Sequence, residues 1–205
     1  MSEVPEAYQQ YLLLVARVDA FGQAIRQRYP GQVTCHAGCD GCCYQQLTVF
    51  PVEAYHLACA VASLAPATRQ HLRDRLLAPP DPWHILNEPQ ACVLLEQGRC
   101  SLYAARPLMC RMHGFPLASG MIERPDGKQR DCCPLNFSAI PVDDIAPRAV
   151  YNLDLVNQTL AAINYLFVQG HGLSDQRLTI RQAVLQALAE DGPPACTPEQ
   201  LPEPR

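Results

Sequence analysis

The residues with the clearest chemical potential are cysteines gathered near position 40. The segment reads Cys35-His-Ala-Gly-Cys39-Asp-Gly-Cys42-Cys43, and the chain holds 11 cysteines in 205 residues. Spacings of two or three residues let a short loop wrap its thiolates around one metal centre, with sulfur about 2.3 Å from zinc or at a similar distance from iron. The segment therefore predicts a metal centre held by Cys35, Cys39, Cys42 and Cys43.

The adjacent pair Cys42 and Cys43 complicates a centre with a single ion. Side chains of neighbouring residues tend to diverge, so either one thiol is spare or the two serve different metals or different irons of a cluster. His36 lies beside Cys35, and His113 lies three residues after Cys110. We expect both histidines to support the thiolates as hydrogen-bond donors and not as ligands.

Cysteines recur further along the chain in two more segments. The first reads Cys92-Val-Leu-Leu-Glu-Gln-Gly-Arg-Cys100 and continues through Ser-Leu-Tyr-Ala-Ala-Arg-Pro-Leu-Met to Cys110; the second is Cys132-Cys133-Pro134. A four-thiolate zinc site or an oxidised four-iron cluster carries about two net negative charges. Arg106 and Arg111 flank Cys110, so we expect these two arginines to bind the cofactor by offsetting that charge.

Taken together, these motifs resemble the CxxCxxCC family of zinc- or iron-chelating proteins, also called flagellin-N-methylase-like. The shared pattern is Cys-x3-Cys-x2-Cys-Cys, then Cys-x7-Cys-Ser-x-Tyr-x2-Arg-Pro-x2-Cys-Arg, then Cys-Pro, and it runs from Cys35 to Pro134. The resemblance implies that the metal ligands are Cys35, Cys39, Cys42, Cys43, Cys92, Cys100, Cys110 and Cys133. The doubled Cys132-Cys133 leaves open which of the two is the matching ligand.

The spacing favours iron over zinc without deciding between them. Zinc fingers usually pair two Cys-x2-Cys knuckles, whereas the three-plus-two spacing here is nearer an iron–sulfur loop. We therefore expect an iron–sulfur cluster of the 4Fe-4S type, with zinc as the alternative cofactor. Eight thiolates could form two four-cysteine sites, or one four-iron cluster plus a smaller site.

Each metal implies a different function. An iron–sulfur protein would act in electron transfer, in metal handling or as an accessory to an unidentified protein partner. A zinc protein would use the metal for structure or storage, because zinc has no accessible redox chemistry.

Enzymatic alternatives rest on weaker signals. The first three cysteines have the spacing of radical S-adenosylmethionine enzymes, but the chain lacks the repeated βα units that build a partial barrel. The resemblance keeps an iron–sulfur enzyme related to protein N-methylation as an alternative. No hydrolase or methyl-donor motif is recognisable, so the sequence leaves open whether the protein is an enzyme and which residues would be catalytic.

Composition limits the other function classes. Hydrophobic residues make up 48% of the chain and charged residues 18%, which is typical of a globular protein. The net charge of -4 gives no basic field for nucleic acid, and no apolar run approaches the roughly 20 residues of a membrane helix. With its acidic opening residues, the chain is expected to be cytoplasmic and to bind neither nucleic acid nor membrane.

Apolar spacing predicts a mainly α fold, in which a helical scaffold carries cysteine-rich irregular loops and at most a short β-hairpin. The expected helices span 8–29, 51–64, 67–77, 148–169 and 174–190, the last with Ser174 as its N-cap. We expect one metal-binding domain over 1–190, with a cysteine core at about 31–137, flanking helices at 5–29 and 148–190, and a disordered tail at 191–205. Cys59 has helical spacing within an apolar run and is expected in the core, and Cys196 lies in the tail.

Overall fold

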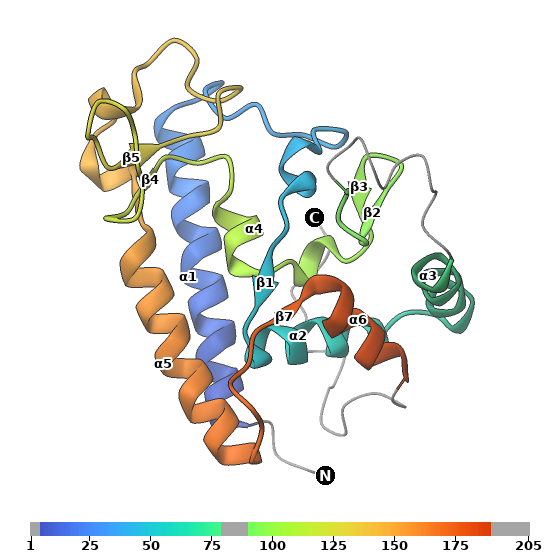
Figure 1. Ribbon diagram of the computed structural model, residues 1–205. Coiled ribbons are helices and arrows are strands. Elements are labelled where there is room, and N and C mark those ends of the chain that lie inside the picture. Colours follow the sequence, from blue (N-terminus) through green and yellow to red (C-terminus); the bar gives the residue numbers. More distant parts are fainter. Residues whose placement is uncertain (1–4, 79–89, 190–205) are drawn as a thin grey trace.

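The computed structural model describes residues 5–78 and 90–189, and over these ranges the fold is mainly α, as predicted (Figure 1). The α-helices are α1 (Glu6–Arg28), α2 (Pro51–Ala62), α3 (Pro66–Leu77), α4 (Leu108–Met112), α5 (Leu153–His171) and α6 (Ile180–Ala189). Short 3-10 helices occupy Gly41–Tyr44, Tyr103–Ala105, Val142–Asp144 and Pro147–Ala149. The helices expected at 8–29, 51–64, 67–77 and 148–169 are confirmed, with ends that differ by a few residues. The predicted tail at 191–205, including Cys196, lies outside the described residues.

Helices α1 and α5 run side by side in opposite directions and form the long wall of the molecule (Figure 1). The buried residues of α1 include Tyr11, Val15, Val18 and Ile25, which recur at three- and four-residue intervals along one face. This face packs against α5 and α4 in one apolar core. Cys59 belongs to the same core, as the sequence predicts, with an exposed fraction of 3%.

A second apolar core joins α2, α3 and α6. Leu57 and Val61 of α2, Leu72 of α3 and Val184 of α6 are all buried in it. Leu94 and Ala105, which come from the cysteine-rich segment, are buried in this core as well. Apolar side chains of the cysteine-rich segment therefore anchor it in the core that these helices form.

Short strand pairs tie distant segments together. Strand β1 (Thr48–Val49) pairs with β7 (Leu178–Thr179), and β2 (Leu95–Glu96) forms a hairpin with β3 (Arg99–Cys100). Strand β4 (Leu117–Ala118) lies between antiparallel β5 (Arg130–Asp131) and parallel β6 (Tyr151–Asn152). These pairings exceed the single hairpin expected, because two-residue strands that meet across the fold leave no periodic signal in the sequence.

The last helix begins later than predicted, and Ser174 is not its N-cap. The Ser174 hydroxyl accepts the N–H of Gln176 in a local turn. Helix α6 starts at Ile180, where the Thr179 hydroxyl accepts the N–H of Gln182 and the Gln182 side chain accepts the N–H of Thr179. This reciprocal capping box fixes the start of the helix, because both donors are satisfied there.

Gly22 is the point of closest approach between α1 and the sheet. A Cβ there would lie 2.9 Å from the Tyr151 hydroxyl and 3.2 Å from the Phe115 ring, and that hydroxyl already donates 2.6 Å to the Val18 carbonyl. We expect Gly22→Ala to lower the free energy of unfolding by about 1–2 kcal/mol in urea titrations. Gly170→Ala in α5, where a Cβ meets nothing within 4 Å, should raise it by about 0.5–1 kcal/mol. Equal effects of the two substitutions would contradict this packing.

His56 is a buried neutral group that makes stability depend on pH. It is fully buried and shares a 2.9 Å hydrogen bond between its Nδ1 and the Tyr8 hydroxyl. Burial, and secondarily the positive charge of Arg111, lower the pKa of His56 from 6.5 to about 3. Below about pH 6.5 the unfolded chain therefore binds a proton at His56, whereas the folded chain keeps the ring neutral. The contribution of His56 to the free energy of unfolding is present above that pH and is lost as the pH falls.

The expected loss from this histidine is about 2 kcal/mol between pH 7 and pH 5. Urea titrations of the wild type and His56→Gln at both pH values measure it, because the difference between the two proteins cancels groups common to both. A pH dependence that is the same in both proteins would show that His56 is not the responsible group.

Within the described residues, the helices include none long and apolar enough to cross a membrane.

Candidate metal centre

The first cysteine loop is folded by its own backbone. The N–H of Cys39 donates 3.1 Å to the His36 carbonyl, and the N–H of Cys43 donates 2.7 Å to the Asp40 carbonyl, where the 3-10 helix Gly41–Tyr44 begins. These successive turns display four thiols along one short stretch of chain. All four are at least partly accessible to solvent.

The β2–β3 hairpin docks on this loop through two glycines. Gly38 donates its N–H 3.1 Å to the Gly98 carbonyl, and a Cβ at Gly98 would lie 3.3 Å from the Gly38 Cα. Both glycines have a positive φ, which residues with a side chain adopt only at a cost. A further bond of 2.6 Å joins the N–H of Cys92 to the Cys43 carbonyl. The second cysteine segment is thereby held against the first.

Cys110 is positioned by the anchoring of α4. The buried carboxylate of Glu53 accepts the N–H of Phe50 and, at 3.1 Å, the N–H of Leu108, so it joins the start of α2 to the start of α4. Next to Cys110, the Arg111 side chain reaches α1 and donates 2.6 Å to the Asp19 carboxylate. These two polar anchors fix the helix that carries the thiol.

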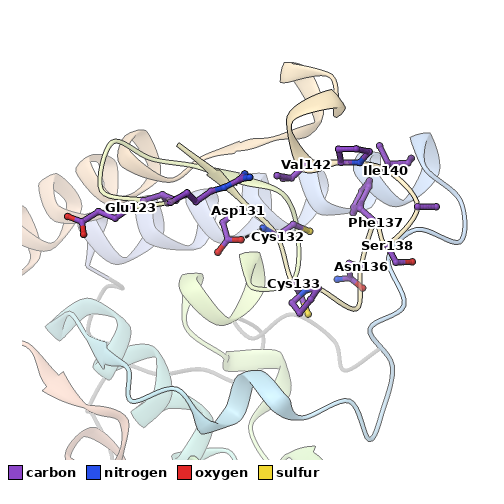
Figure 2. A pocket seen from close by; sticks show the side chains of 14 residues that line it. Glu123, Asp131, Cys132, Cys133, Asn136, Phe137, Ser138, Ile140 and Val142 are labelled. Carbon is purple, nitrogen blue, oxygen red and sulfur yellow. Dashed lines mark hydrogen bonds between the residues drawn. The ribbon is translucent and has the colours of Figure 1, made fainter. Parts of the chain in front are cut away.

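Cys132 and Cys133 leave the third loop in different directions, beside an open depression of about 660 Å³ (Figure 2). The Cys132 thiol donates 3.3 Å to the Gly114 carbonyl and so already has a partner. The N–H of Asn136 bonds the Cys133 carbonyl at 2.9 Å and closes the loop.

A first set of thiols is defined by the effect that the charge of each thiolate has on the pKa of the others. Burial raises the pKa of Cys39, and negative charge on Cys35 and Cys133 raises it further. Burial likewise raises the pKa of Cys42, and the same two neighbours add to that rise. The third loop therefore brings Cys133 to the first loop. We call Cys35, Cys39, Cys42 and Cys133 the first group.

A second set gathers around the hairpin and α4. Burial raises the pKa of Cys43 to about 12, and charge on Cys42, Cys92 and Cys100 contributes. Burial also raises the pKa of Cys110 to about 12, and charge on Cys100 and Cys92 raises it further. We call Cys43, Cys92, Cys100 and Cys110 the second group.

Cys42 and Cys43 connect the two groups. Cys42 feels the charge of Cys35 and Cys133 in the first group, and its own charge acts on Cys92 and Cys110 in the second. Adjacent cysteines, awkward for one ion, suit an arrangement in which each thiol belongs to a different group.

The chemistry of this donor set fits a metal centre. Thiols whose pKa is raised by burial and by one another stay protonated at neutral pH unless a cation compensates them. A bound metal supplies that charge and displaces the protons, since thiolate is the ligating form. Across 5–78 and 90–189, no three histidine, cysteine, aspartate or glutamate side chains are arranged as a closed site for one ion.

The two arginines predicted at the cofactor have different environments. Arg106 stacks on Tyr103 with its guanidinium 4.0 Å from the ring centroid, and its charge lowers the pKa of Cys100 against the larger effect of burial. The Arg111 side chain is only 1% exposed, is paired with Asp19 and also donates to the Ala104 carbonyl. Arg106 also lies 4.0 Å from Asp19 but is 20% exposed, so it stays our proposed counter-charge, whereas the buried Arg111 is bound to Asp19 at 2.6 Å, which indicates a structural role.

The histidines beside the cysteines are differently engaged. His36 shares a 2.8 Å hydrogen bond between its Nδ1 and the Thr34 carbonyl, which fixes the ring. Burial lowers the pKa of His113, so this half-buried ring is neutral at pH 7. The prediction that both support the thiolates stays a prediction.

Known proteins were compared with the whole chain. Residues 34–134 match the model of the CxxCxxCC family, described as "putative zinc- or iron-chelating domain". These residues form a CxxCxxCC domain. The matched CxxCxxCC segment holds both groups of thiols, and the match supports metal chelation with zinc or iron as the metal. No curated protein and no solved structure matches the chain.

Asn136, which lies two positions beyond the CxxCxxCC segment, is a residue at the thiols that cysteine spacing did not predict. Its side-chain amide donates 3.2 Å to the Cys35 sulfur. An asparagine shortly after a proline is typical of a turn, so its type and position carried no signal for a site.

Proposed function

We propose that this CxxCxxCC protein holds two metal centres, one on each group of four thiolates, and that both are iron–sulfur clusters of the 4Fe-4S type. The proposal is carried by the electrostatic influence that thiols of the three segments exert on one another, which relates Cys133 to the first loop and Cys92, Cys100 and Cys110 to Cys43. Four cysteine thiolates are the usual ligand set of such a cluster. The three-plus-two spacing of the first loop supports iron, as argued from the sequence.

The connection between the groups supports electron transfer. Cys42 and Cys43 are adjacent in the chain, so a ligand of one centre would be bonded directly to a ligand residue of the other. Two redox centres so close would exchange electrons readily and pass them to a second protein. Arg106 would then partly offset the negative charge of the second centre.

Zinc is the second candidate for the bound metal, and one feature of the same thiol groups favours it. Four thiolates also form the closed tetrahedral set of a structural zinc site. Two zinc ions would tie the hairpin, the first loop and the third loop together, and the protein would then serve metal storage or only its own stability.

Elemental analysis separates these candidates. Iron, zinc and acid-labile sulfide are measured on protein purified without oxygen, with visible spectra before and after dithionite. The proposal predicts iron with matching sulfide and a broad visible absorption that bleaches on reduction. Zinc without colour or sulfide would overturn the cluster and leave the zinc function.

A further inference from the structure

Asn136 is a buried polar side chain, 3% exposed, that bonds two of the cysteine-bearing loops. Its Oδ1 accepts the N–H of Thr34 at 2.8 Å and the Thr34 hydroxyl at 3.0 Å. Its Nδ2 donates 2.6 Å to the Gly114 carbonyl and 3.2 Å to the Cys35 sulfur. Both N–H groups of the amide have acceptors and its oxygen accepts the Thr34 N–H, while the single Thr34 hydroxyl proton is shared with the Leu135 carbonyl at 3.0 Å.

The orientation of the amide is fixed by its partners. A backbone N–H can only donate, so Thr34 has to face the Asn136 oxygen. A backbone carbonyl can only accept, so Gly114 has to face the nitrogen. One N–H is then left, and it points to the Cys35 sulfur.

Gly114 makes room for this contact. Its φ is +97°, and a Cβ there would lie 3.0 Å from the Cys35 sulfur and 3.1 Å from the Asn136 nitrogen. A side chain at this position would be strained and would push the amide and the sulfur apart. The glycine and the asparagine thus form one cradle for the sulfur of Cys35.

We infer that Asn136 is a positioning residue that holds the Cys35 thiolate for the first metal centre through an N–H···S hydrogen bond. The inference rests on the proposed function. A donor to a metal-bound sulfur stabilises its negative charge and orients it, and such partners affect both affinity and the electronic properties of the centre.

Cobalt(II) is the probe that tests this role, since its thiolate charge-transfer bands report sulfur ligation directly. In Asn136→Asp the shape and the acceptor for Thr34 stay, while the donor to sulfur becomes a carboxylate oxygen. We expect cobalt and zinc to bind the first group about 10- to 100-fold more weakly, and the charge-transfer bands to shift to lower energy. Thr34→Val is the matched control, because it removes a hydroxyl bond to Asn136 and leaves the donor to Cys35. Its bands should stay at the wild-type energy.

A second measurement covers the case in which Asn136→Asp does not fold. In wild-type protein loaded with a spin-half cadmium isotope, NMR should show a coupling between cadmium and one Asn136 side-chain amide proton, transmitted through the hydrogen bond to sulfur. If the cobalt-loaded wild type shows thiolate bands but the cadmium-loaded wild type shows no such coupling, the inference is overturned and the metal centre stands. Unchanged cobalt bands in folded Asn136→Asp would overturn the inference in the same way. Absence of thiolate bands in the wild type would instead overturn the proposed function.

Discussion

Cys133→Ser is expected to weaken metal binding at the first group on the order of 100-fold, whereas Cys132→Ser should leave it within about twofold. The charge of Cys133 reaches Cys39 and Cys42, whereas Cys132, although it feels the charge of Cys133 and Cys35, has its thiol held by the Gly114 carbonyl at 3.3 Å. A serine hydroxyl is a poor substitute for a thiolate with iron or zinc. Metal retained by each variant during competition with a chelator measures the effect.

The two neighbours form a matched pair because both substitutions exchange sulfur for oxygen on the same loop. The second group should keep its metal in Cys133→Ser, so total content should fall by about half. Loss of metal in Cys132→Ser alone would reverse the assignment of the ligand, and equal losses in both would mean that the third loop binds through the pair.

Asp19→Ala is expected to lower the free energy of unfolding by about 3–5 kcal/mol, because it leaves the guanidinium of Arg111 buried without a counter-charge. The ion pair is 2.6 Å long, and the Arg111 side chain is 1% exposed. Helix α4, which carries Cys110, would lose its anchor to α1. The second group should therefore bind metal more weakly as well. Urea unfolding and chelator competition measure the two effects.

Asp143→Ala is the control for this ion pair. Asp143 bonds Lys128 at 2.8 Å, but the Lys128 side chain is 53% exposed, so the pair lies in solvent. Its loss should cost less than about 1 kcal/mol. Similar costs for the two aspartates would contradict the buried role assigned to Arg111.

Much of the scaffold could be predicted from local patterns. Apolar spacing located α1 and α5, because each buries one face along its whole length. The start of α6 escaped prediction since the residues before it pair with Thr48–Val49 on a distant segment. Sequence near Ser174 contains no trace of that partner.

The metal centre, like the scaffold, could be predicted only in part. Cysteine type and spacing singled out the thiols, because intervals of two and three residues suit thiolates that converge on one metal centre. Their grouping depended on Cys133 returning to the first loop across the fold, and the role of Arg111 depended on Asp19, a residue of α1. Contacts between residues so far apart follow from tertiary packing, which spacing does not report.

The central claim is that cysteine thiolates from the three segments are the ligands of the metal. X-ray absorption at the edge of the metal found in the purified protein tests it most directly, since it counts the atoms bound to that metal. The account predicts a shell of four sulfurs at about 2.3 Å with no nitrogen or oxygen, whether the metal is iron or zinc. A shell made mainly of nitrogen or oxygen would contradict it.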